Sequence, residues 1–181
     1  MSEQKNEGAG EWEGWNVAEN LPKSANPKTQ IINPPELAKP RGFSHGIVVE
    51  GGRLLMLAGQ DASDAEGRIA APGDLVAQYE QVIKNLKAVV EAAGGELQDI
   101  VKLNIYVTDC AAYRARLKPL GEIHRANFGL HYPATALFEV KGLFNPDAMI
   151  EMEGVAHLID DSTVPTLDRE TVKEKNFPFS S

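Results

Sequence analysis

The sequence predicts a single α+β domain with the element order ββαβαββ, and three observations support this prediction. Apolar side chains recur at steps of three and four through residues 74–93, which is the pattern of an amphipathic helix. Residues 101–109, VKLNIYVTD, are rich in β-branched and aromatic side chains and predict a strand. Two further apolar runs, at 134–140 and 149–159, predict the strands that end the domain.

The predicted domain covers residues 39–159 of the 181-residue chain and opens with two short apolar runs. Gly51 and Gly52 lie between these runs and predict a tight hairpin. Several prolines in residues 1–38 exclude a continuous helix or a central strand, so we expect an extended arm or a tail there. Residues 160–181 are polar and predict a second tail.

Both predicted helices have recognisable ends. Asp74 is the expected N-cap of the first helix, and Gly94-Gly95 provides its C-terminal stop. The second helical segment has an apolar stripe, and Pro119 predicts that its helix begins near this residue, because proline is tolerated in a first turn. The stripe consists of Tyr113, Leu117, Leu120, His124 and Phe128. This order of elements fits a mixed sheet with both helices on one face.

Two of the predicted strands have apolar side chains on both faces. They contain LLML at 54–57 and LNIYV at 103–107. Because two helices cover only one face of a sheet, the other face needs a further cover. We expect other copies of the chain to provide it in a closed homo-oligomer. The alternative is that the two tails cover this face.

Composition excludes several classes of function. The chain has 18 Lys and Arg against 26 Asp and Glu, a net charge of −8 without a basic run, which argues against nucleic-acid binding. Its one cysteine, Cys110, excludes an internal disulfide and fits a reducing cytoplasm. The N-terminal residues lack the apolar core of a signal peptide, and no apolar run approaches the ~18 residues that span a bilayer. We therefore expect a cytoplasmic protein without nucleic-acid or membrane partners.

The final predicted strand contains the clearest candidate for chemistry. Period-two alternation places Glu151 and Glu153 on one face. Near a subunit boundary, such a pair of carboxylates can polarise a water molecule or hold a proton in transit. The alternative interpretation is a solvated strand face or an interface ion pair. The four histidines lie on separate segments without helical spacing, so no metal site is expected.

Several segments of the chain together resemble the RidA/YjgF family, from about Pro40 to His157. They are GIVVEGGRLLMLAGQ, KAVVEAAGGELQDIVKLNIYVTD, YPATALFEV and MIEMEGVA. The most specific parts are the VEAAG…DIVK junction and the final IE.E..A strand. The resemblance implies a chorismate-mutase-like homotrimer with a small-molecule ligand cleft at each subunit interface. It also implies hydrolysis of reactive enamines and imines, such as 2-aminoacrylate, without a cofactor.

The active-site pattern of that family is only partly present. Thr135 replaces the arginine that binds the substrate carboxylate in deaminating members, and Leu137 replaces a usual cysteine. Phe43 replaces a tyrosine, and His45 stands where glutamine is common. A threonine hydroxyl cannot replace the two-bond fork of a guanidinium. Losing such a contact costs on the order of 2–5 kcal/mol of binding free energy.

Two other positions match the family. Glu151 corresponds to the glutamate that positions the hydrolytic water, and Gly59 lies in an AGQ turn that resembles the ligand-side SGQ turn. The resemblance therefore implies Glu151 as the catalytic residue and five ligand-binding positions. These are Phe43, His45, Gly59, Thr135 and Leu137. Three cations near the cleft-forming segments could substitute for the missing arginine: Arg41, Arg53 and Lys141.

We therefore expect a hydrolase of small enamines, imines or related metabolites that is not a typical 2-aminoacrylate deaminase. The alternative is a non-catalytic trimer that binds or senses a small metabolite, which the apolar replacements favour. A ribonuclease activity is disfavoured by the charge of −8.

Overall fold

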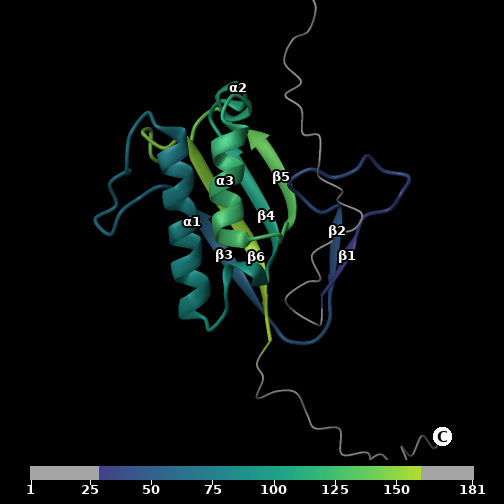
Figure 1. Cartoon of the computed structure of the whole chain (residues 1–181). Coiled ribbons are helices and arrows are strands. Elements are labelled where there is room, and N and C mark those ends of the chain that lie inside the picture. Colours follow the sequence, from purple (N-terminus) through teal and green to yellow (C-terminus); the bar gives the residue numbers. More distant parts are fainter. Residues whose placement is uncertain (1–28, 160–181) are drawn as a thin grey trace, which may run out of the picture.

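The computed structural model describes residues 29–159, which form a four-stranded sheet covered by helices on one face and a separate two-stranded sheet (Figure 1). In chain order the elements are β1 (Thr29–Ile32), β2 (Gly46–Val49), β3 (Arg53–Gln60), α1 (Leu75–Ala92), the 3-10 turn η1 (Leu97–Asp99), β4 (Ile100–Val107), α2 (Cys110–Arg114), α3 (Leu117–Phe128), β5 (Ala134–Glu139) and β6 (Ile150–Leu158). The residues before 29 and after 159, which include most of the predicted arm and the predicted second tail, lie outside this description.

The larger sheet is mixed, as predicted. Its strand order is β3-β6-β4-β5, with β4 and β5 parallel and the other two pairs antiparallel. Along β6, Ile150 and Met152 are fully buried under the helices, whereas Glu151 and Glu153 alternate with them and are only partly buried. This confirms the α+β class, the two main helices on one face and the phase of the last strand.

The ends of the first helix form as the sequence predicts. The Asp74 side chain accepts hydrogen bonds from the Val76 and Ala77 amides at 3.0 and 3.1 Å. Gly94 has a φ of 86°, and the Gly95 amide donates to the Val90 carbonyl at 3.0 Å, which closes the C-terminus. In the second segment, Pro119 is the third residue of α3, within a first turn, and the short helix α2 precedes it.

The predicted hairpin at Gly51-Gly52 is wrong. β2 pairs with β1 in the small sheet, and β3 pairs with β6 instead. Both glycines have positive φ values, 63° and 66°, as a tight turn needs. However, the turn packs against the end of β6, where His157 Nε2 lies 2.7 Å from the Gly51 carbonyl oxygen and a Cβ on Gly52 would lie 2.6 Å from the same nitrogen. Packing against β6, together with the pairing of β1 with β2, outweighs the local turn preference.

The face of the large sheet opposite the helices is uncovered in the single subunit. Leu54 and Met56 of β3 are 55% and 66% exposed, and Phe138 of β5 is 47% exposed. Their register partners, including Tyr106 of β4, place them all on this face. The expectation that two helices leave apolar strand residues uncovered is therefore met. Within residues 29–159, no helix is long and apolar enough to cross a membrane.

Gln78 connects α1 to the loop before β6 and is fully buried. Its Nε2 donates to the Asp147 carbonyl at 3.0 Å, and its Oε1 accepts from the Met149 amide at 2.7 Å. Replacing Gln78 with Leu should lower the free energy of unfolding by about 1–3 kcal/mol, because the Met149 amide loses its buried acceptor. Urea denaturation measures this loss. The matched change at the exposed Gln30 should leave the midpoint nearly unchanged, and equal effects would contradict the prediction.

Candidate active site

Glu151 lies near the start of β6 on the uncovered face, directly beside Gly59 of β3. A Cβ built on Gly59 would contact Glu151 Oε1 and lie 3.0 Å from its Cδ. Gly59 falls in an irregular part of β3, where the pairing with β6 shifts between Leu57 and Gln60. The absence of a side chain at Gly59 therefore leaves the space that the Glu151 carboxylate occupies.

The surroundings of Glu151 favour its protonated form. Burial raises the pKa of this carboxyl above its usual range, and the negative charges of Asp61 and Glu153 raise the pKa further. A glutamate that keeps its proton closer to neutral pH is suited to giving and taking protons during a reaction.

The pKa of Glu153 is shifted in the opposite direction by side chains of β4. The Tyr106 hydroxyl donates to Glu153 Oε1 at 2.6 Å, and Asn104 Nδ2 donates to the same oxygen at 3.1 Å. Lys102 Nζ in turn donates to Asn104 Oδ1 at 2.6 Å. The hydrogen bonds from Tyr106 and Asn104, followed by the nearby charge of Lys102, lower the pKa of Glu153. Glu153 is therefore held as an anion two residues from Glu151.

Asp61 and this β4 network are not among the site residues predicted from the sequence. The signal was present, because period-two alternation in residues 101–109 puts Lys102, Asn104 and Tyr106 on one face. What the pattern could not supply is the register, in which Asn104 pairs with Glu153 and Tyr106 pairs with Glu151.

A second group of predicted site residues surrounds Pro133, just before β5. The Ser44 amide and the Thr135 hydroxyl both donate to the Pro133 carbonyl at 3.0 Å. On either side of Ser44, the rings of Phe43 and His45 make an edge-to-face contact with their centroids 5.2 Å apart. The chain thus brings Phe43, His45 and Thr135 together, although 90 residues separate His45 from Thr135.

Within one subunit, the structure does not bring Thr135 or Leu137 to the face that bears Glu151. Thr135 pairs with Leu103, and Leu137 pairs with Ile105, whose side chains are buried under the helices. Residues that pair across neighbouring strands point to the same face of a sheet, and successive residues of one strand point to opposite faces. Thr135 and Leu137 therefore lie on the helix side of the sheet, as Leu103 and Ile105 do. The predicted site residues therefore form two groups: Gly59 with Glu151, and Phe43, His45, Thr135 and Leu137.

Of the three sequence-based substitutes for the missing arginine, Arg53 lies far from Glu151 within one subunit. Arg53 pairs with Leu158, seven residues along β6 from Glu151, or about 23 Å at ~3.3 Å per residue. Lys141 is exposed and lies two residues beyond the end of β5. Arg41 is exposed in the loop that leads to Phe43.

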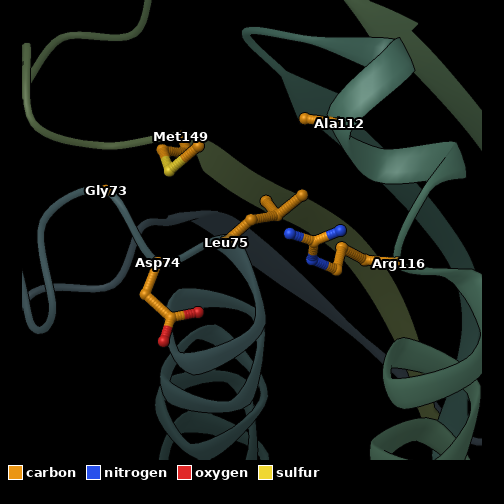
Figure 2. Close-up of a pocket in the computed structure, with 6 residues that line it drawn as sticks. All are labelled: Gly73, Asp74, Leu75, Ala112, Arg116 and Met149. Carbon is orange, nitrogen blue, oxygen red and sulfur yellow. The ribbon is translucent and has the colours of Figure 1, made fainter.

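A separate surface pocket lies between the start of α1, the α2–α3 connection and the residue before β6 (Figure 2). It has a volume of about 460 Å³ and is lined by Gly73, Asp74, Leu75, Ala112, Arg116 and Met149. None of the predicted site residues lines it. The Asp74 carboxylate already caps α1, and Arg116 is exposed, so this pocket offers no set of groups for catalysis. Among residues 29–159, no group of three or more His, Cys, Asp or Glu side chains is arranged to hold a metal ion.

Replacing Gly59 with Ala should displace the Glu151 carboxylate. The new methyl group would meet the flexible end of that side chain, which can swing aside, so the stability of the fold should change little. The position of the carboxylate should change, and we expect kcat of the activity proposed below to fall on the order of tenfold. Steady-state kinetics beside a thermal melt separate the two effects. A fall in the melting temperature with unchanged kcat would contradict the prediction.

The family described as Endoribonuclease L-PSP matches residues 35–158. A RutC family protein of Pyrococcus abyssi is 34% identical over 129 residues, which cover 71% of this chain and 96% of that protein. A RutC family protein of Pyrococcus horikoshii is 31% identical over 139 residues, with 77% and 93% covered.

Solved structures agree with the sequence comparison. The conserved Rid family protein YyfB of Yersinia pestis superimposes with a TM-score of 0.66 at 35% identity, covering 72% of this chain and 99% of that one. RidA from the Antarctic bacterium Psychrobacter sp. PAMC 21119 gives a TM-score of 0.52 at 32% identity, covering 71% and 98%. Both similarities extend over nearly the whole length of the other protein.

Proposed function

Because this chain belongs to the RidA/YjgF family, we propose that it is a cofactor-free hydrolase of small, reactive enamines or imines that lack a free α-carboxylate. Family membership supports a role in small-metabolite chemistry. The observation that supports hydrolysis best is the Glu151 carboxylate, which lies against Gly59 and has a pKa raised by burial and by Asp61 and Glu153.

The proposed reaction needs one water molecule and four proton transfers, all of them through Glu151. Protonated Glu151 first gives its proton to the enamine carbon, which forms an iminium ion. The resulting carboxylate then takes a proton from water as the water oxygen attacks the iminium carbon. Glu151 then transfers that proton to the nitrogen, and the hydroxyl group of the intermediate returns its own proton to the Glu151 carboxylate as the carbon–nitrogen bond breaks. This step releases ammonia and a carbonyl product and restores protonated Glu151. One residue that alternates between acid and base is sufficient for this sequence.

The identity of residue 135 supports the restriction on substrate. The Thr135 hydroxyl donates to the Pro133 carbonyl, so its one proton is already used. It cannot offer a carboxylate the paired donors of a guanidinium. A substrate whose carboxyl group is absent, esterified or part of a ring does not need that contact.

We further propose that the site lies between subunits of a cytoplasmic homotrimer. Two observations support a site between subunits: the face that bears Glu151 exposes Leu54 and Met56, and Thr135 and Leu137 lie on the other side of the same sheet. A neighbouring subunit can cover the apolar face and bring its own Thr135 group to Glu151. Light scattering should give a mass of about 59 kDa, three times 19.7 kDa. A stable monomer would contradict the assembly.

The activity can be tested by the release of ammonia from enamines generated in the assay. The purified protein should release ammonia faster from neutral enamines, such as the methyl ester of 2-aminoacrylate, than from 2-aminoacrylate itself. Spontaneous hydrolysis in buffer and a Glu151→Gln variant provide the two baselines. A higher rate on 2-aminoacrylate than on its ester would contradict the restriction, and no rate above either baseline would contradict hydrolysis.

A non-catalytic trimer that binds or senses a small metabolite is the second candidate. Leu137 is partly exposed at the sheet edge and Phe43 lacks a hydroxyl, so these two positions favour binding over proton transfer. A neutral ligand that binds and is recovered unchanged after long incubation would support this candidate.

A further inference from the structure

Glu153 is held in place by hydrogen bonds that a solvent-exposed strand residue would not need. Its Oε1 accepts hydrogen bonds from both Tyr106 and Asn104. The Tyr106 ring is fixed in turn by Phe138, which stacks on it with centroids 5.8 Å apart and planes 22° from parallel. Strands β4, β5 and β6 thus all contribute to holding one carboxylate.

We propose that Glu153 is a positioning residue for Glu151: as a fixed anion two residues along the same strand face, it keeps Glu151 able to carry the proton of the reaction. The inference rests on the proposed function for the identity of that reaction. The electrostatic coupling between the two carboxyl groups does not depend on it and can be measured separately.

The charged and titratable groups near Glu151 on this face allow such a coupling. After β3, Asp61 adds a second negative charge, and its Oδ1 accepts from the Ser63 amide at 3.0 Å. From β4, Tyr106 adds a neutral donor, and the cation Lys102 donates to Asn104 and to the Leu103 carbonyl. β3 presents Gly59 next to Glu151, and β5 presents the uncharged Phe138.

Tyr106 is suited to hold Glu153 over a wide pH range. Its hydrogen bond to Glu153 raises the pKa of the phenol, so the hydroxyl stays protonated and remains a donor. The same bond lowers the pKa of Glu153. Glu153 therefore remains an anion at pH values where Glu151 gains and loses its proton.

The test is the titration of Glu151, followed by carboxyl ¹³C NMR on the purified full-length oligomer labelled at glutamate. The Glu151 signal is assigned by its absence in Glu151→Gln. In Glu153→Gln, the Glu151 titration should move to lower pH, because a like charge is removed while Tyr106 can still donate to the amide oxygen. The matched control is Glu50→Gln, at an exposed residue beyond the opposite end of β6. This change should leave the Glu151 titration unchanged.

A second variant separates charge from structure. Tyr106→Phe removes a hydrogen bond but leaves the Glu153 charge, so the Glu153 titration should move to higher pH while that of Glu151 stays close to wild type.

An unmoved Glu151 titration in Glu153→Gln, or an equal shift in Glu50→Gln, would overturn the proposal. If the protein releases no ammonia from any enamine, the proposed function fails, but the NMR titration still decides the coupling. Where activity is present, the pH profile of kcat should shift with the Glu151 titration.

Discussion

Replacing Glu151 with Gln is expected to lower kcat for enamine or imine hydrolysis by about 10²- to 10⁴-fold, with a much smaller change in KM. Glutamine has the shape of glutamate and fills the space beside Gly59, so a substrate should still bind. It cannot donate or accept the proton that the reaction moves. Initial rates of ammonia release over a range of substrate concentrations separate kcat from KM.

Loss of folding should not explain that result. Burial and two neighbouring anions raise the pKa of Glu151, so the folded state holds this proton more tightly than the unfolded chain does. The contribution of Glu151 to stability therefore falls as the pH rises through the region between the unfolded and folded pKa values. A neutral glutamine removes this cost, and the melting temperature at neutral pH should rise on the order of 1 °C, because screening keeps the effect small. Glu50→Gln is the matched control for loss of one negative charge. Activity of Glu151→Gln within a few-fold of wild type would contradict the assignment.

The sequence predicts well those features that depend on residues close together in the chain. The α1 boundaries follow from Asp74, whose carboxylate reaches amides two and three residues on, and from Gly94, whose positive φ ends the helix. The phase of β6 follows from the alternation of Ile150 and Met152 with Glu151, because only one face is fully buried at this end of the strand.

Features that depend on how the strands pair with one another could not be predicted from the sequence alone. β5 reads ATALFE, with apolar residues on both of its faces, so the sequence does not say which face turns to the helices. Only pairing with β4 shows that Thr135 is opposite Leu103 and that Phe138 is level with Tyr106. The failure of the Gly51-Gly52 hairpin has a related cause, since long-range packing on His157 determined the conformation of a locally favourable turn.

The position of Thr135 yields the second large prediction, a gain of activity. Thr135→Arg is expected to increase kcat/KM for 2-aminoacrylate about thirtyfold or more, which corresponds to a free energy of about 2 kcal/mol or above for a charged contact in a partly desolvated cleft. The change breaks the hydrogen bond to the Pro133 carbonyl, which costs only about 0.5–1.5 kcal/mol of stability. Thr135 is on an edge strand and partly exposed, so a longer side chain has room to extend. Competition between 2-aminoacrylate and its methyl ester in one reaction measures the ratio directly.

Thr135→Gln is the matched control, because it adds length and hydrogen-bonding capacity without the cation or its two-bond fork. It should leave the preference for the ester unchanged. Equal gains from Arg and Gln would mean that side-chain size, rather than charge, limits carboxylate binding.

A wild-type protein that already prefers 2-aminoacrylate would show that another cation, such as the exposed Arg41 of a neighbouring subunit, fills the role. Combining Thr135→Arg with Arg41→Ala then distinguishes the two sources: a full gain in the double variant assigns the carboxylate contact to residue 135 alone.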